Sequence, residues 1–123
     1  MASRSKASDA IRLRLALAPG VAFGPGKADL LEGIRETGSI AAAGRRMRMS
    51  YKRAWQLVEE LNRSFREPLV ETSKGGAGGG GAHLTRTGQD VLERYQRMHA
   101  SAADALAADV AGVLRHVPPR ARG

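Results

Sequence analysis

SIAAAGRRMRMSYKRAWQLVEELNRSFR, residues 39–66, decides the fold of this chain. Ser39 and Ser50 each stand where a helix N-cap is expected, because a serine hydroxyl can accept a hydrogen bond from the free backbone N–H groups of a first helical turn. Apolar residues recur at helical spacing after both serines. The stretch therefore predicts a first helix over 39–46, a tight turn, and a second helix over 50–65.

The predicted second helix has two unlike faces when residues are placed about 100° apart. Its apolar face consists of Ala54, Leu57, Val58, Leu61 and Phe65. Lys52, Gln56 and Arg63 lie on the opposite face, and Arg53 flanks them. Five cations and no acid occur from Gly44 to Arg53. This pattern indicates a helix-turn-helix, in which the second helix enters the major groove of DNA. A merely solvated charged face is the alternative.

Composition narrows the range of partners. The 123 residues suffice for one domain with a modest core. A net charge of +8 favours a polyanionic partner, either nucleic acid or an anionic membrane surface. No apolar run approaches the roughly 18 residues of a membrane span, and Arg12 and Arg14 interrupt what would be the apolar part of a signal peptide. We therefore expect a cytoplasmic protein without membrane contact. Because cysteine is absent, disulfides and thiolate metal sites are excluded.

The N-terminal part predicts a strand and a helix. Residues 1–10 are small, polar and basic, which is typical of a disordered arm. Residues 11–17, IRLRLAL, alternate apolar and polar side chains and predict a half-buried strand. Two prolines and three glycines predict a loop over 19–26. A helix over 27–36 follows, with Gly38 as its C-terminal cap.

A glycine-rich hairpin follows the second helix, which Pro68 ends. Residues 69–73 and 82–85 have strand character, and six of the nine residues over 74–82 are glycine. Two short strands around a glycine tip, directly after a recognition helix, predict a wing over 69–85. Bare backbone at such a tip can approach a phosphate or the minor groove closely. The tip also fits the dinucleotide pattern G-x-G-x-x-G, but no helix follows it immediately, and it is short for an interdomain linker.

The C-terminal part predicts one long helix over 86–117, opened by Thr85 as N-cap and followed by a disordered tail over 118–123. An unbroken helix of that length measures roughly 48 Å, more than a domain of this size needs internally. A stripe near helical spacing runs along it: Leu92, Tyr95, Met98, His99, Ala102, Leu106, Val110 and Val113. We therefore expect this helix to pair with a second copy of the chain.

The expected fold class is mainly α with a small β-sheet. We expect a winged helix-turn-helix over 11–90, followed by the long C-terminal dimerisation helix over 86–117.

Five short motifs resemble one family of regulators. They are GSI at 38–40, SYKRAW at 50–55, LVE at 69–71, GGAGGGG at 75–81 and LTRTGQ at 84–89. Together they resemble the N-terminal winged-helix domain of ModE-type molybdenum-responsive transcriptional regulators over roughly residues 10–105. A looser similarity to LysR-type DNA-binding domains is also present. The SYK-x-AW segment with a glycine-rich wing and LT-x-x-G is far more specific than a generic helix-turn-helix.

This resemblance implies a transcriptional regulator that binds a palindromic operator in double-stranded DNA as a homodimer, with the last helix contributing to dimerisation. By matching position, the DNA-facing residues of the recognition helix would be Ser50, Tyr51, Lys52, Arg53 and Gln56. The wing would contribute Lys74, Gly75, Gly76, Gly78 and Gly79. In that family, molybdate-binding β-barrel modules follow this domain. Since the chain ends at Gly123, we expect it to lack them, and the resemblance does not extend to direct molybdate sensing.

The expected DNA contacts are of two chemical kinds. Arg and Lys can bond guanine O6 and N7, and Gln can bond adenine N6 and N7, so Lys52, Arg53 and Gln56 are the expected base readers. Contacts to phosphates alone, which position a protein without specifying a sequence, are the alternative. The expected phosphate clamps are Arg45, Arg46 and Arg48.

The remaining residues indicate neither catalysis nor metal binding. His83, His99 and His116 have no metal-ligand spacing. No nucleophile with a base and an orienting group is evident, so we expect no enzyme, no cofactor and no metal. Trp55 is expected to pack in the core. Two alternatives to an autonomous regulator stay open: an interaction module that forms a heterodimer with a full-length relative, and a sequence-independent DNA-coating protein.

Overall fold

The computed structural model describes residues 8–73 and 81–119. Three predicted features lie outside the described residues: most of the basic arm, the wing tip with Lys74, Gly75, Gly76, Gly78 and Gly79, and the end of the C-terminal tail. The chain divides into two units, Arg14–Arg94 and the combination of Met1–Leu13 with Tyr95–Gly123.

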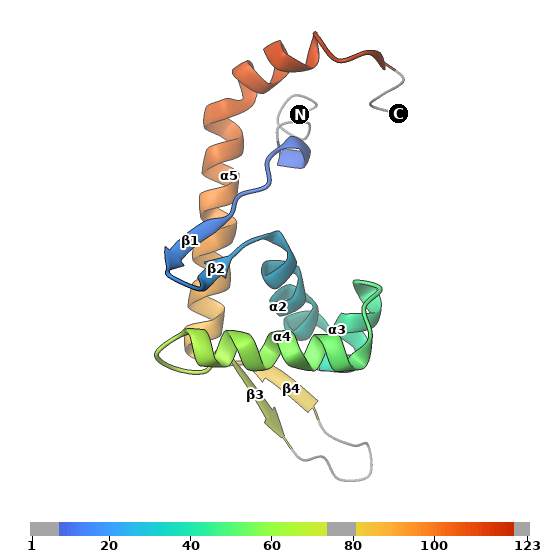
Figure 1. Ribbon diagram of the computed structural model, residues 1–123, viewed down its shortest axis with the longest axis vertical. Helices are drawn as coiled ribbons and strands as arrows, with labels where there is room; N and C mark the ends of the chain where they lie inside the picture. Colours follow the sequence, from blue (N-terminus) through green and yellow to red (C-terminus); the bar gives the residue numbers. More distant parts are fainter. Residues whose placement is uncertain (1–7, 74–80, 120–123) are drawn as a thin grey trace. The chain divides into compact units, whose positions relative to one another are not determined.

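Helices dominate the described residues, and the elements are labelled as in Figure 1. In chain order they are β1 (Leu15–Ala18), β2 (Val21–Phe23), α2 (Pro25–Thr37), α3 (Ile40–Arg46), α4 (Tyr51–Ser64), β3 (Val70–Ser73), β4 (Gly81–Leu84) and α5 (Arg86–Leu114). β1 pairs antiparallel with β2, and β3 pairs antiparallel with β4. The predicted fold class is confirmed, although the strands form two separate two-stranded sheets rather than one.

Local capping chemistry places the central helices where the sequence predicts them. Gly38 ends α2 with φ 72°, a left-handed conformation that glycine adopts without a steric penalty. The Ser39 hydroxyl accepts the Ala42 N–H at 3.0 Å at the start of α3. The Ser50 hydroxyl accepts the Arg53 N–H at 3.0 Å at the start of α4. The three predicted caps are therefore confirmed.

The first hairpin differs from the sequence prediction. The sequence predicts a strand over 11–17, whereas β1 begins only at Leu15. It also predicts a loop over 19–26, and β2 lies within that loop. Gly20, at φ 77°, lets the chain reverse between the two strands. The loop prediction is wrong because a strand of three residues leaves almost no periodicity to detect.

The unit Arg14–Arg94 has an apolar core. Its fully buried large side chains are Phe23, Leu30, Leu31, Ile34, Leu61, Leu69 and Leu92. α3 packs against both α2 and α4, and β4 contacts α2. In Figure 1 the β3–β4 hairpin extends away from these helices, below α4. Phe65 follows the end of α4 and packs edge-on against Phe23, with ring centroids 6.5 Å apart.

The predicted wing strands form a closed hairpin base. Residues 70–73 and 81–84 pair in register. Immediately after the second strand, the Thr85 N–H donates to the Leu69 carbonyl over 3.0 Å. The Thr85 hydroxyl accepts the Gly88 N–H at 2.9 Å, so Thr85 is the N-cap of α5, as predicted. One threonine therefore both closes the wing and starts the long helix.

α5 is continuous from Arg86 to Leu114. It ends three residues before the predicted end, and residues 115–117 follow as a turn. The helix prediction is therefore confirmed except at its last residues.

The unit of Met1–Leu13 and Tyr95–Gly123 joins α5 to the start of the chain. The Tyr95 hydroxyl donates to the Leu13 carbonyl over 2.6 Å, and His99 Nε2 lies 3.1 Å from the Ile11 carbonyl oxygen. The strand prediction over residues 11–14 is wrong because these carbonyls meet side chains of α5 rather than a neighbouring strand. Within the predicted disordered arm, residues 8–10 are helical.

Replacing Gly88 by alanine is expected to destabilise the fold, although this change is usually favourable in a helix. A Cβ at Gly88 would collide with the backbone carbonyl of Leu69, which is already fixed as the acceptor of Thr85. We expect Gly88→Ala to lower the free energy of unfolding by about 1–3 kcal/mol in a urea titration.

Gly112 provides the matched control in the same helix. A Cβ at Gly112 would meet the end of the Arg115 side chain at 3.7 Å, which is ordinary contact. Gly112→Ala should therefore be neutral or stabilising by up to about 1 kcal/mol. Equal losses for the two variants would contradict this account of the packing at Gly88.

Candidate nucleic-acid interface

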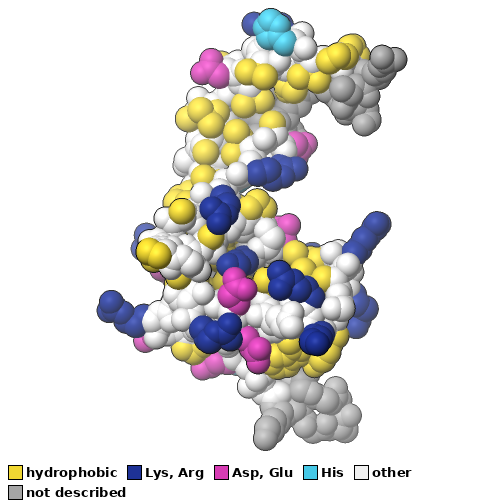
Figure 2. Space-filling model, viewed as in Figure 1, with side chains coloured by type: hydrophobic (Ala, Val, Ile, Leu, Met, Phe, Trp, Pro, Cys, Tyr) yellow, Lys and Arg dark blue, Asp and Glu magenta, His cyan; other side chains and the backbone are white. Residues whose placement is uncertain are grey.

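α4 presents two chemically different sides. Its buried residues are Ala54, Leu57, Val58 and Leu61. Its exposed polar residues include Lys52, Arg53, Gln56 and Arg63. Figure 2 shows Lys and Arg side chains projecting from the surface over α3 and α4. The structure therefore exposes the predicted base readers together on the outer side of one helix.

Close packing around α3 fixes where α4 begins. A Cβ added at Gly33 of α2 would lie 2.9 Å from the Cβ of Ala43 in α3. A Cβ added at Gly44 of α3 would lie 3.0 Å from the Cβ of Ala54 in α4. Both distances are shorter than ordinary side-chain contacts, so the three helices approach each other as closely as their backbones allow. The outer face of α4 is oriented by this packing.

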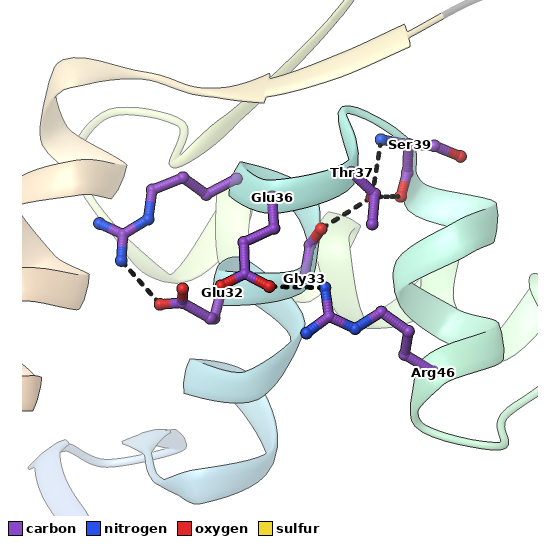
Figure 3. Close-up of polar contacts among 7 residues, drawn as sticks. Glu32, Gly33, Glu36, Thr37, Ser39 and Arg46 are labelled. Carbon is purple, nitrogen blue, oxygen red and sulfur yellow. Dashed lines mark hydrogen bonds and ion pairs between the residues drawn. The ribbon is translucent and has the colours of Figure 1, made fainter.

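Arg46 is held by an acid of the preceding helix. Its Nη1 lies 2.8 Å from Glu36 Oε1. Figure 3 shows the two side chains in contact. A hydrogen bond with Glu32, followed by the ion pair with Arg46, lowers the pKa of Glu36. The Arg46 and Glu36 side chains are each half exposed, so their ion pair contributes little to stability. It does neutralise one of the cations that the sequence predicts to clamp phosphate.

A second polar cluster joins the end of α2 to the start of α3. The Thr37 hydroxyl lies 2.7 Å from the Gly33 carbonyl oxygen and 3.1 Å from the Ser39 carbonyl oxygen. The Ser39 N–H donates back to the Thr37 hydroxyl over 3.2 Å (Figure 3). These bonds fix the short connection from which the helix-turn-helix starts.

The other cations around the turn form no ion pair with a described residue. They are Arg45, Arg48, Lys52 and Arg53, all exposed. Within residues 8–73 and 81–119, none of the four forms an ion pair. The turn and the first turns of α4 therefore form a positively charged surface, as an interface with a polyanion requires.

Lys27 of α2 connects α4 to β2. Its ammonium lies 3.0 Å from Glu60 Oε2 and donates to the Ala22 carbonyl over 2.8 Å. The hydrogen bond from Lys27 lowers the pKa of Glu60. This lysine therefore connects β2, α2 and α4 and is not available to a ligand.

Asn62 attaches the wing to α4, a role that the sequence did not reveal. Its Oδ1 accepts the N–H of Leu69 at 2.9 Å and of Val70 at 3.1 Å. Its Nδ2 donates to the Val70 carbonyl over 3.1 Å. The only sequence signal is an amide side chain on the flank of the helix, seven residues before a predicted strand. The recognition helix and the first wing strand are thus joined by one side chain.

Tyr51 and Trp55 form an aromatic pair on the flank of α4. Their rings meet edge-on, with centroids 6.1 Å apart, and Tyr51 is 60% exposed. Trp55 is half-buried rather than a core residue, so that prediction is wrong: residue 55 lies about 100° around the helix from buried Ala54. Its indole Nε1 is buried and has no hydrogen-bond partner among the described residues.

The residues of the predicted dimerisation stripe differ in how far they are buried within a single chain. Leu92 and Tyr95 are buried within a single chain. His99, Ala102 and Val110 are half-buried. The exposed members are Met98 at 40%, Leu106 at 43% and Val113 at 65%. Figure 2 shows hydrophobic side chains on the surface along the C-terminal part of α5.

The described residues contain neither a cluster of metal ligands nor a membrane-spanning helix. Residues 8–73 and 81–119 contain no group of three or more His, Asp or Glu side chains that could hold a metal ion. None of the helices in those ranges combines the length and the apolar character that a membrane span requires.

The middle of the chain matches a known protein family. Residues 28–89 match the bacterial regulatory helix-turn-helix proteins of the LysR family. The matched region runs from α2 through the two helices and the wing into the first turn of α5. It covers about half of the chain and contains every cation of the surface described above.

Curated relatives are similar over the same region. The transcriptional regulator ModE of Yersinia pestis is 41% identical over 85 residues, which cover 69% of this chain and 32% of that protein. The molybdenum-pterin-binding protein MopA of Rhodobacter capsulatus is 39% identical over 104 residues, 85% of this chain and 38% of that protein. The DNA-binding transcriptional dual regulator ModE of Escherichia coli (strain K12) is 40% identical over 85 residues, 69% of this chain and 32% of that protein.

The resemblance to ModE-type DNA-binding domains is thereby confirmed. The chain spans about a third of the length of these relatives.

Removing the Asn62 side chain is expected to loosen the wing. Asn62→Ala leaves two backbone N–H groups and one carbonyl without their partners, so we expect the free energy of unfolding to fall by about 1–3 kcal/mol. Amide hydrogen exchange at Leu69 and Val70 should accelerate in the same variant. Arg63→Ala, an exposed neighbour on α4, is the control and should change neither quantity. Unchanged exchange in Asn62→Ala would contradict the role of Asn62.

Proposed function

This chain belongs to the bacterial regulatory helix-turn-helix family of the LysR type, and we propose that it reads a palindromic operator in double-stranded DNA as a homodimer. The family and the ModE-type relatives support a DNA-binding transcriptional regulator. The operator symmetry, the dimer and the residues that contact DNA are our proposal.

The outer side of α4 is the observation that carries this proposal. Lys52, Arg53 and Gln56 are exposed there, while the opposite side of the helix is buried against α2 and α3. A helix of this kind fits the major groove, which is roughly 12 Å wide. We assign base contacts to these three residues and phosphate contacts to Arg45 and Arg48.

Two further groups complete the proposed interface. Ser50 and Tyr51 lie at the start of α4 and are exposed beside the base readers. The wing, which Asn62 attaches to α4, would bring Lys74 and the glycines of its tip to the DNA backbone. Arg46 makes a weaker phosphate contact in this proposal, because Glu36 competes for its guanidinium.

The exposed apolar residues of α5 support the proposed homodimer. Met98, Leu106 and Val113 leave a row of apolar surface on a long helix. A second copy of the same helix would cover it in a two-fold arrangement. Two recognition helices would then read half-sites about 34 Å apart or a multiple of that spacing.

The names of the relatives suggest where the target genes lie. MopA is named a molybdenum-pterin-binding protein, and the relative from Azotobacter vinelandii, 35% identical over 95 residues, is named a molybdenum transport protein. We propose that this chain acts on genes of molybdenum metabolism, in the cytoplasm and without catalytic activity of its own.

Selection from a random duplex library at about 150 mM salt tests operator recognition, and a two-fold symmetric motif is the expected result. Arg53→Ala and Gln56→Ala should each relax base preference at one position per half-site, by about 1–3 kcal/mol for a lost bidentate contact. Arg97→Ala, an exposed cation of α5, should leave the motif unchanged. If both α4 variants select the motif with unchanged base preference at every position, the assignment of the base readers is wrong. If the wild type selects no motif, the proposed operator recognition is wrong.

Leu106→Asp tests the dimer. A charge in the apolar row should shift the protein from dimer to monomer in sedimentation equilibrium, because an unpaired carboxylate is costly to bury. The control is Ala108→Asp, since Ala108 is exposed on the opposite side of the helix. Dimers that persist in Leu106→Asp would show that this row is not the interface.

A further inference from the structure

The turn between α3 and α4 contains an unusual backbone conformation. Arg48 has φ 58°, the only positive value at a non-glycine position among residues 8–73 and 81–119. L-residues rarely adopt this left-handed conformation, because the Cβ approaches the following carbonyl.

The hydrogen bonds of the turn explain why the conformation is required. The Met49 N–H donates to the Gly44 carbonyl over 3.0 Å, and the Arg48 N–H donates to the Arg45 carbonyl over 3.0 Å. Met47 is the C-cap of α3. This pair of bonds closes a helix C-terminus only when the residue after the cap is left-handed, and that residue is Arg48. Glycine is the residue that such a position favours.

The preceding helix, α2, has the favoured glycine at its C-terminus. α2 ends with a left-handed glycine, Gly38, at φ 72°. α3 ends with the same handedness at position 48 but with an arginine. A non-glycine residue there costs on the order of ten-fold in the folding equilibrium constant. The fold alone would therefore be served better by glycine.

No ion pair of the Arg48 side chain offsets this cost among the described residues. The side chain is exposed, and it forms no ion pair within the described part of the chain. Arg46, two residues earlier, differs in this respect because it pairs with Glu36. A strained residue whose side chain forms no ion pair with the described residues indicates a functional constraint at its position.

We propose that Arg48 is a phosphate-anchoring residue retained at the expense of stability, so that position 48 exchanges folding stability for DNA affinity. This inference rests on the proposed DNA-binding function. It adds that the phosphate contact of Arg48 lowers the folding stability of the chain. The turn leads directly into the recognition helix, so a cation there lies beside the groove that the helix enters. A single guanidinium on the DNA backbone strengthens binding to all sequences alike.

The variant Arg48→Gly separates folding stability from DNA affinity. The variant should be more stable than the wild type, with a folding equilibrium constant raised several-fold, because glycine relieves the strain by more than it adds to the freedom of the unfolded chain. Its affinity for operator DNA should fall roughly ten-fold. The slope of log K against log salt concentration should become shallower by about one, the loss of one phosphate contact.

Two further variants distinguish the charge from the backbone. Arg48→Ala removes the cation but keeps a Cβ in the left-handed conformation, so it should lose the same affinity as Arg48→Gly without the gain in stability. Arg48→Lys keeps a cation and should keep the salt slope of the wild type. Both are measured by urea unfolding and by a salt series of operator binding.

The outcomes identify which statement fails. If Arg48→Gly is no more stable than the wild type, the strain argument is overturned. If Arg48→Gly and Arg48→Ala bind operator DNA with the wild-type affinity and salt slope, the phosphate contact is overturned while the proposed function stands. If the wild type binds no duplex DNA, the proposed function fails and this inference fails with it.

Discussion

Three hydrogen bonds that involve the side chain of Asn62, two accepted and one donated, connect parts of the unit Arg14–Arg94. They connect α4 to the backbone at Leu69 and Val70, where the wing begins. The Leu69 carbonyl in turn accepts the Thr85 N–H, and Thr85 caps α5. The recognition helix, the wing and the start of the long helix therefore share one segment of backbone. A displacement of that segment would move all three elements, so their relative positions depend on the backbone at Leu69 and Val70.

The cations of the unit Arg14–Arg94 fall into two groups according to whether they pair with a carboxylate. Lys27 and Arg46 are engaged with carboxylates and connect helices to one another. Arg45 and Arg48 stand exposed at the turn, and the outer side of α4 continues their positive surface. Acids of α2 and α4 thus neutralise the cations that connect the helices, whereas Arg45 and Arg48 form no ion pair with the described residues. The sign of the surface follows from this division as well as from the net charge of +8.

The sequence predicts what depends on near neighbours and misses what depends on distant ones. The caps at Gly38, Ser39 and Ser50 involve partners within four residues, and all are confirmed. The Asn62 bonds, the Arg46–Glu36 pair and the half-buried position of Trp55 depend on how the helices pack, which no local pattern records. Periodicity places Leu92 and Leu106 on one stripe, yet only packing shows that the first is buried within a single chain and the second is exposed.

Gly38 has a second role through its carbonyl, which accepts the Ala82 N–H over 2.9 Å. That N–H belongs to β4 and points away from β3, along the outer edge of the hairpin. Two-stranded sheets usually leave such edges open, and an open edge can template pairing with strands of other molecules. Here the end of a helix occupies part of the β4 edge. The β3–β4 hairpin can therefore extend from the helices while offering fewer free backbone groups for aggregation.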